Sequence, residues 1–176
     1  MESCDRATLA GRRDWIVLAV LVGAGLRRDE LAGLTFADVK ALPLEGKKRT
    51  VLEVTGKGSK TRVIPISDRL ADALYTWQKE TGGGRVARSL TKSAQLGESI
   101  SGVGIFDVVR RYGEVIGIPD LAAHDLRRSY AQLGYDAGIP ITQISKLLGH
   151  ASITTTQKYL NLSLNLKMTI SDFIPL

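Results

Sequence analysis

Residues 50–66 read TVLEVTGKGSKTRVIPI, and this stretch decides the class of fold. Apolar and polar side chains alternate over residues 50–54 and again over residues 62–66, which is the period of a β-strand with one buried face. The glycine-containing segment 56–60 between them is typical of a turn. The sequence therefore predicts a β-hairpin, and residues 42–44 add a short third strand to a small antiparallel sheet.

Patterns typical of helices flank this sheet on both sides. Apolar residues recur at helical spacing, and glycine, proline or a capping residue marks most of the expected ends. Helices are predicted over residues 14–22 (capped by Asp14), 28–34, 70–77, 100–116 and 124–136, from Pro140 onward, and after Ser152. Residues 81–97 are expected to form a long loop. The predicted class is α+β: a mainly helical domain with a small three-stranded antiparallel sheet.

The composition limits the kind of protein. A chain of 176 residues fits one domain, and its formal net charge of +6 suits a polyanionic partner such as nucleic acid. The single cysteine, Cys4, has no partner for an internal disulfide, which favours a reducing cytosol. The longest apolar run, residues 15–26, is too short to cross a bilayer, so no membrane association is expected.

The polar residues that suggest chemistry fall into four short segments. They are G-L-R at 25–27, G-K-G at 56–58, H-D-L-R at 124–127, and G-H at 149–150 followed by Tyr159. Each segment alone has an ordinary interpretation, such as a solvated arginine, a hairpin tip or a packed tyrosine. The combination is less ordinary, because both histidines of the chain fall inside these segments. Arg127 precedes His150 by 23 positions, and His150 precedes Tyr159 by nine.

This order and spacing resemble the signature of the tyrosine recombinases, the phage integrase family. The flanking sequences GLRRDEL (25–31) and LLGHASITTTQKY (147–159) also resemble that family, and the resemblance runs from about Asp14 to about Leu160. It implies the tyrosine recombinase catalytic fold. It also implies a site-specific DNA recombinase or integrase, an enzyme that cleaves and rejoins DNA strands through a 3′-phosphotyrosyl intermediate.

The resemblance assigns roles to the matching residues. Tyr159 would be the nucleophile that attacks the phosphorus atom. Arg27 and Arg127 would clamp the non-bridging oxygens of the scissile phosphate, because a guanidinium offers paired donors and keeps its charge. His150 would add a hydrogen bond to the same phosphate.

Three further residues complete the expected site. His124, one turn before Arg127, would exchange a proton with the tyrosine, since imidazole gains and loses a proton near neutral pH. Lys57 at the hairpin tip would protonate the leaving 5′-oxygen. Glu30 follows Arg27 by one turn and could orient that arginine, although a solvated helix carboxylate explains this residue equally well.

The implied reaction needs no cofactor and no metal ion. Two arginines, a lysine and histidines around one phosphate leave little need for Mg²⁺. The sequence agrees with this expectation, since it contains no carboxylate cluster and no Cys/His spacing typical of a metal site.

The chain departs from the family pattern at its beginning. Full-length recombinases usually carry an N-terminal helical domain that clamps the other face of the DNA, whereas here about a dozen residues precede the first expected helix. Residues 1–176 are therefore expected to form a single catalytic domain without the N-terminal core-binding domain, as a fragment or as a minimal member. Part of the target choice would then lie outside this chain.

The expected partner is double-stranded DNA. The resemblance implies a homo-oligomer, a tetramer, on DNA, and the chain can be a monomer in isolation. Leucines alternate with polar residues after Tyr159, so residues 161–176 are expected to form a tail that packs in trans or folds back on its own domain. The expected location is the cytoplasm, at the nucleoid in a prokaryotic host. Further basic residues are expected to contact backbone phosphates: Arg85, Arg88, Lys92, Arg110, Arg111 and Arg128.

Two alternatives stay open. A type IB topoisomerase shares this chemistry but relaxes DNA, and the Gly149-His150 pair with its integrase-like flanks favours a recombinase. A catalytically silent DNA-binding module could keep the fold, but all six expected catalytic residues are present, which argues against loss of activity. The β-branched run 154–156 has weak helix propensity, so the helix before Tyr159 is expected to be mobile without DNA.

Overall fold

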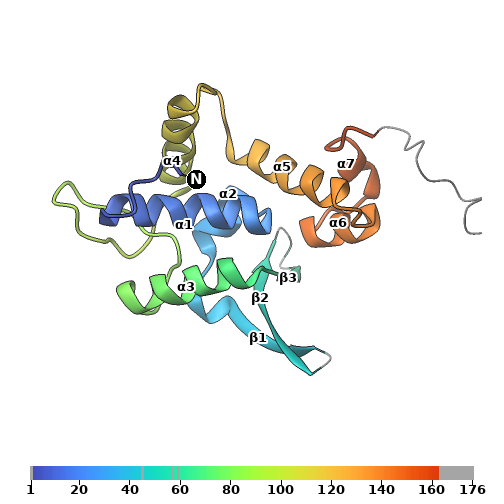
Figure 1. The fold of residues 1–176 in the computed structure, drawn as a ribbon, viewed down its shortest axis with the longest axis horizontal. Coiled ribbons are helices and arrows are strands. Elements are labelled where there is room, and N and C mark those ends of the chain that lie inside the picture. The colour runs from blue at the N-terminus through green and yellow to red at the C-terminus, as the bar shows by residue number, and fades with distance from the viewer. Residues whose placement is uncertain (1, 45, 57, 59, 163–176) are drawn as a thin grey trace, which may run out of the picture.

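The structure is a computed structural model that describes residues 2–44, 46–56, 58 and 60–162. Its elements follow in the order α1 (Leu9–Ala24), α2 (Arg28–Gly33), the 3₁₀ helix η1 (Phe36–Asp38), β1 (Val39–Leu44), β2 (Lys47–Thr55), β3 (Thr61–Pro65), α3 (Asp68–Thr81), α4 (Gly102–Val115), α5 (Ala123–Asp136), α6 (Ile141–Leu148) and α7 (Ile153–Gln157) (Figure 1). The predicted α+β class is confirmed.

The three strands form one antiparallel sheet in the order β1-β2-β3. Leu52 pairs with Val39 on one side and with Ile64 on the other, and Leu52, Val54 and Ile64 belong to the main core. The predicted hairpin is therefore confirmed. β1 extends three residues further toward the N-terminus than the predicted 42–44, because Val39, Lys40 and Ala41 continue the ladder with β2.

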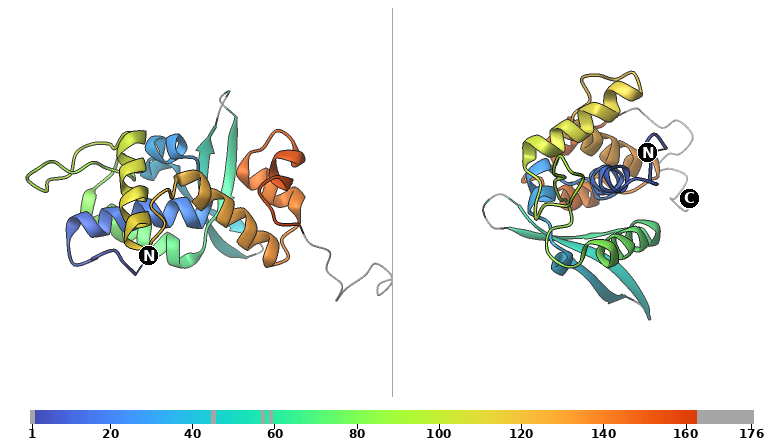
Figure 2. Two further views of the ribbon diagram at one scale, coloured as in Figure 1. Left: turned by 90° about the horizontal axis from the view of Figure 1, so that it is seen from above. Right: turned by 90° about the vertical axis from the view of Figure 1, so that its left-hand side faces the viewer.

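Helix α1 runs through the middle of the molecule and is buried along most of its length. It contacts α3 on one side and α4 and α5 on the other (Figures 1 and 2). The predicted start at Asp14 is wrong, since the helix begins at Leu9 and the Thr8 side chain accepts a hydrogen bond from the Gly11 amide. Asp14 lies buried inside the helix, where its carboxylate pairs with Arg13 at 2.6 Å and with Arg111 at 2.9 Å.

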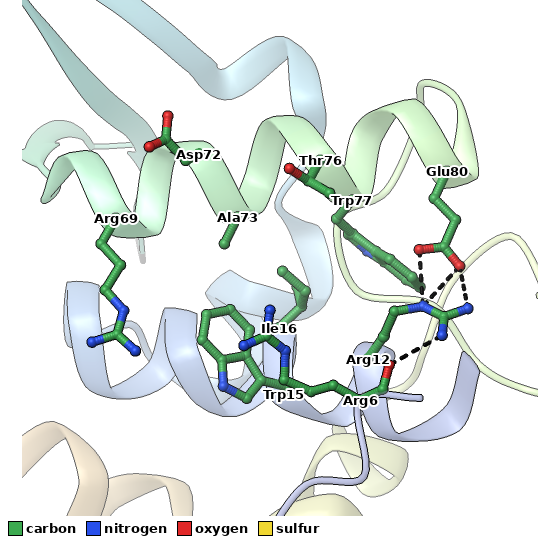
Figure 3. A pocket seen from close by; sticks show the side chains of 10 residues that line it. All are labelled: Arg6, Arg12, Trp15, Ile16, Arg69, Asp72, Ala73, Thr76, Trp77 and Glu80. Carbon is green, nitrogen blue, oxygen red and sulfur yellow. Dashed lines mark hydrogen bonds and ion pairs between the residues drawn. The ribbon is translucent and has the colours of Figure 1, made fainter. Parts of the chain in front are cut away.

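A hollow of about 270 Å³ lies between α1 and α3 (Figure 3). The guanidinium of Arg6 lies 4.8 Å from the centre of the Trp15 ring, and the ion pair between Arg12 and Glu80 borders the same hollow. None of its lining residues belongs to the four polar segments singled out in the sequence. This hollow therefore reflects how α1 and α3 pack rather than the expected chemistry.

Helices α6 and α7 lie together at one end of the molecule, next to α5 (Figure 1). We call residues 141–160 the tyrosine module. Its buried side chains Ile144, Leu148 and Leu160 pack with Ala131 of α5 in an apolar cluster of their own, separate from the main core. The position of the module relative to α1 and the sheet therefore depends on α5, on the packing of Leu147 against the main core, and on polar contacts.

Glycine turns end α1 and α6 just before Arg27 and His150, two of the expected site residues. Gly25 ends α1 in the left-handed region at φ 61°, and a Cβ there would lie 2.5 Å from an atom of the Tyr130 ring, so only glycine fits. Gly149 ends α6 in the same conformation at φ 64°.

Within the part of the chain that the structure describes, no helix has the length and apolar character needed to span a membrane.

Candidate active site

Five of the six expected catalytic residues come together at the junction of α1, α5 and the tyrosine module. Tyr159 follows α7, and its ring centre lies 5.1 Å from that of His124 and 4.9 Å from that of His150, edge to face in both cases. In the adjoining ion-pair network, Arg27 lies 2.8 Å from one carboxylate oxygen of Glu30 and Arg127 lies 3.9 Å from the other. The tyrosine ring is therefore flanked by two imidazole rings.

Lys57 lies outside the described residues, as do residues 163–176 of the expected tail. The base of the hairpin that carries Lys57 is described, and the Gly56 amide donates to the Lys60 carbonyl at 2.9 Å. The role expected for Lys57 stays a prediction, as does the packing of the tail.

Arg27 borders two hollows that together outline the site. One, of about 300 Å³, is also lined by His124 and Arg127. The other, of about 560 Å³, is also lined by Arg62 and His150. Positive side chains thus line both hollows, which is the electrostatic character that a phosphate diester requires.

Arg127 is almost completely buried, with 1% of the residue exposed. One terminal nitrogen donates to the Gly25 carbonyl at 2.5 Å, and the other donates to the Leu148 carbonyl. Burial and the neighbouring charge of Arg27 lower the pKa of Arg127 to about 10, so it stays charged at neutral pH. Among the described residues, the buried Nε atom has no hydrogen-bond partner. The two terminal nitrogens therefore hold the guanidinium in place, while the Nε donor stays unpaired within the described residues.

Glu30 holds Arg27 by two hydrogen bonds. Its carboxylate accepts one from the Arg27 amide at 2.8 Å and one from the Arg27 guanidinium at 2.8 Å. The Glu30 side chain is only 5% exposed, so the alternative of a solvated helix carboxylate is wrong. Burial works to raise the pKa of Glu30, but the hydrogen bonds from Arg62 and Arg27 outweigh it and lower this pKa to about 2.

Arg62 was missed in the sequence, although it makes the strongest ion pair of the site. Its two terminal nitrogens form a fork with the Glu30 carboxylate at 2.8 and 2.7 Å, and its Nε donates to the Leu147 carbonyl at 2.7 Å. A usable signal was present: in β3 Arg62 occupies the same face as buried Ile64. An arginine on the inward face of a strand needs a charged or polar partner.

Thr156 is a second missed residue. Its side chain is fully buried, and its Oγ1 lies 2.9 Å from Nδ1 of His150. Burial, Arg127 and Arg27 together lower the pKa of His150 to about 4. His150 is therefore neutral at pH 7, and the hydroxyl fixes the orientation of its ring.

The predicted cap of α7 is confirmed, because the Ser152 side chain accepts a hydrogen bond from the Thr154 amide.

Several basic residues outside the site already have protein partners. Arg111 reaches buried Asp14, and Arg85 donates to the Gly33 carbonyl, so both also hold the fold together. The guanidinium of Arg128 lies 5.9 Å from the centre of the Tyr159 ring. Contact of these residues with DNA phosphates stays a prediction.

Among the residues that the structure describes, no group of three or more histidine, cysteine or acidic side chains is placed to hold a metal ion.

The low pKa of Glu30 predicts a specific loss of stability in acid. Its pKa of about 2 in the folded protein lies below the ordinary 4.5, so its ionised form stabilises the fold above pH 4.5. That contribution, on the order of 3 kcal/mol, is lost as the pH falls from 4.5 toward 2. Urea unfolding should show Glu30→Gln less stable than wild type at neutral pH and closer to it near the acid end. If acidification lowered the free energy of unfolding of both proteins by the same amount, this account would be contradicted.

Comparison with known proteins gives consistent matches. The chain matches the Phage integrase family over residues 1–165. Tyrosine recombinase XerC of Pelobacter propionicus is 33% identical over 98% of this chain and 55% of its own length. Tyrosine recombinase XerA of Pyrococcus horikoshii is 34% identical over 84% of this chain and 50% of its own length. The chain thus spans about half the length of the curated relatives it matches.

Solved structures show the same fold. A crystal structure of XerA recombinase matches with a TM-score of 0.69 and 23% identity, over 88% of this chain and 55% of that one. XerH site-specific recombinase bound to palindromic difH substrate, in a post-cleavage complex, matches with a TM-score of 0.68 and 22% identity, over 88% and 43% of the two chains. The fold described above is therefore that of the catalytic part of these proteins.

Proposed function

Because the chain belongs to the phage integrase family, we propose that it is the catalytic domain of a site-specific tyrosine recombinase that cleaves and rejoins DNA through Tyr159. The observation that carries this proposal is the position of the Tyr159 ring between His124 and His150, near the ion-pair network of buried Arg127 and Glu30. Packing alone gives no reason for two histidines and two arginines to converge on one tyrosine.

In the proposed cleavage step, the Tyr159 oxygen attacks the scissile phosphorus and the bond to the 5′-oxygen breaks. The products are a 3′-phosphotyrosyl bond and a free 5′-hydroxyl. His124 accepts the proton of the tyrosine. By resemblance to the family, Lys57 supplies the proton to the departing 5′-oxygen. Rejoining is the reverse reaction, in which a 5′-hydroxyl attacks the phosphotyrosine and releases Tyr159.

The protein's contribution to this step is charge and orientation. Arg27 and Arg127 would neutralise the non-bridging oxygens as a fifth oxygen bonds to phosphorus. Glu30 and two backbone carbonyls hold these arginines before DNA binds, so little reorganisation remains for the transition state. His150, neutral at pH 7, would donate a hydrogen bond rather than a charge. We propose that no metal ion or cofactor takes part.

Double-stranded DNA is the proposed partner. XerH was solved on difH substrate, and a lambda integrase dimer on a COC′ core site matches this chain with a TM-score of 0.62 and 21% identity, over 84% of this chain and 41% of that one. We propose that several copies of this chain, a tetramer, assemble on DNA, with residues 161–176 packing in trans. We also propose a single catalytic domain over residues 1–176, which acts in the cytoplasm at the nucleoid.

A covalent-capture experiment tests the proposed function. The chain is incubated with a pool of nicked duplexes of random sequence, in which loss of a short fragment after cleavage traps the protein–DNA adduct. The expected result is an SDS-resistant adduct, formed equally well in EDTA, whose DNA-linked peptide contains Tyr159 by mass spectrometry. Duplex binding without any adduct would instead indicate a silent DNA-binding module. Efficient relaxation of supercoiled plasmid by the chain alone would favour a topoisomerase.

A further inference from the structure

Three consecutive backbone carbonyls at the C-terminal end of α6 each accept a hydrogen bond from a different arginine. Leu147 accepts from Arg62 at 2.7 Å, Leu148 accepts from Arg127, and Gly149 accepts from Arg27 at 3.5 Å. The last carbonyls of a helix have no partner within the helix and carry its negative dipole end, so cations bind there favourably. These bonds connect the tyrosine module to the rest of the protein.

Arg62 differs from the other two arginines in how its guanidinium is used. All three of its nitrogens have protein partners, two on Glu30 and one on Leu147. Its side chain is 12% exposed, compared with 42% for Arg27. A guanidinium occupied in this way serves as an internal link, even though it lines a hollow with His150.

The link joins the two halves of the proposed active site. On one side, the Glu30 carboxylate that binds Arg62 also accepts hydrogen bonds from the amide and the guanidinium of Arg27. On the other side, the Arg62 side chain packs directly against the turn before His150, where a Cβ on Gly149 would lie 3.0 Å from the Arg62 Cδ atom. The apolar cluster of the tyrosine module is separate from the main core, although Leu147 of α6 packs against that core, so the Arg62 link adds a directed polar contact to this apolar one.

We propose that Arg62 is a positioning residue for DNA cleavage, which aligns the tyrosine module with Arg27 by joining Glu30 to the Leu147 carbonyl. This role rests on the proposed function. Arg62 touches neither the phosphate nor Tyr159 in this account. Its loss lets the nucleophile and the phosphate clamp shift relative to each other, and a displacement of about 1 Å can slow a reaction by about 100-fold.

The test compares Arg62→Ala, Arg62→Lys and a control, Arg49→Ala, on a trapping duplex. Arg49 is an exposed arginine on the same sheet. Binding affinity and the cleavage rate constant at saturating protein are measured separately. Arg62→Ala is expected to lower the rate constant about 10- to 100-fold with little change in affinity. Arg62→Lys, which cannot make the fork, should fall in between. Millimolar guanidinium chloride, against equal NaCl, should partly restore Arg62→Ala only.

Each contrary outcome is distinct. If Arg62→Ala weakens binding while the rate constant at saturation is unchanged, Arg62 is a phosphate contact and the positioning role is wrong. Equal rates for Arg62→Ala, Arg49→Ala and wild type would also overturn it, while leaving the proposed function intact. A wild-type chain that forms no adduct overturns the proposed function itself. If Arg62→Ala does not fold by circular dichroism, Arg62→Lys decides: wild-type cleavage by this variant would contradict the role.

Discussion

Tyr159→Phe is expected to abolish covalent capture of DNA while leaving the fold and duplex binding intact. The substitution removes only the hydroxyl, so no phosphodiester exchange can take place on this side chain. The aromatic ring remains, and with it the edge-to-face contacts with His124 and His150 and the packing against the apolar cluster of the tyrosine module. Adduct is measured on denaturing gels, and the fold by thermal unfolding.

Tyr135→Phe is the matched control for this experiment. Tyr135 packs against the same apolar cluster and lies near the C-terminal end of α5, whereas His124 and Arg127 lie near its N-terminal end. It should form adduct at the wild-type rate. An adduct on Tyr159→Phe would mean that another side chain is the nucleophile, and the assignment of Tyr159 would be wrong.

Arg127→Ala is expected to cause the second largest effect, on both catalysis and stability. Loss of a donor aimed at developing negative charge costs about 10²–10³-fold in rate. The substitution also leaves the buried carbonyls of Gly25 and Leu148 without their donor, at about 1–3 kcal/mol each. Arg127→Lys keeps the charge but cannot reach both carbonyls, so it should recover little of either loss. Single-turnover cleavage and urea unfolding measure the two effects.

A neutral substrate separates the catalytic effect from the structural one. In a duplex whose scissile phosphate carries a methyl group in place of one non-bridging oxygen, there is less charge for Arg127 to neutralise. Cleavage of this substrate should therefore be impaired less by Arg127→Ala than cleavage of the ordinary duplex. Equal impairment on both substrates would show that Arg127 serves the fold alone. Arg49→Ala, a change in an exposed arginine of β2, controls for the loss of net charge.

Local patterns were enough to predict the class of fold and most of the site. The alternation of apolar and polar residues over 50–54 and 62–66 can be read from neighbouring residues alone, and the hairpin that it predicts is confirmed. The motif residues were identified by spacing, and five of the six lie together in the structure. The error at Asp14 arose because local pattern alone made it a helix cap, whereas its buried carboxylate pairs with Arg13 and with Arg111, which lies 97 positions away.

By itself, then, the sequence determined the helices, the sheet and which residues are proposed for the chemistry, because these depend on side-chain periodicity and on motif order. Only the tertiary structure decided how the site is held together. The bonds of Arg62 to Glu30 and Leu147 span 32 and 85 positions, and that of Arg27 to Gly149 spans 122. No local pattern encodes such pairs, because they form only when α2, β3 and the C-terminal end of α6 come together and place buried charges next to helix-end carbonyls.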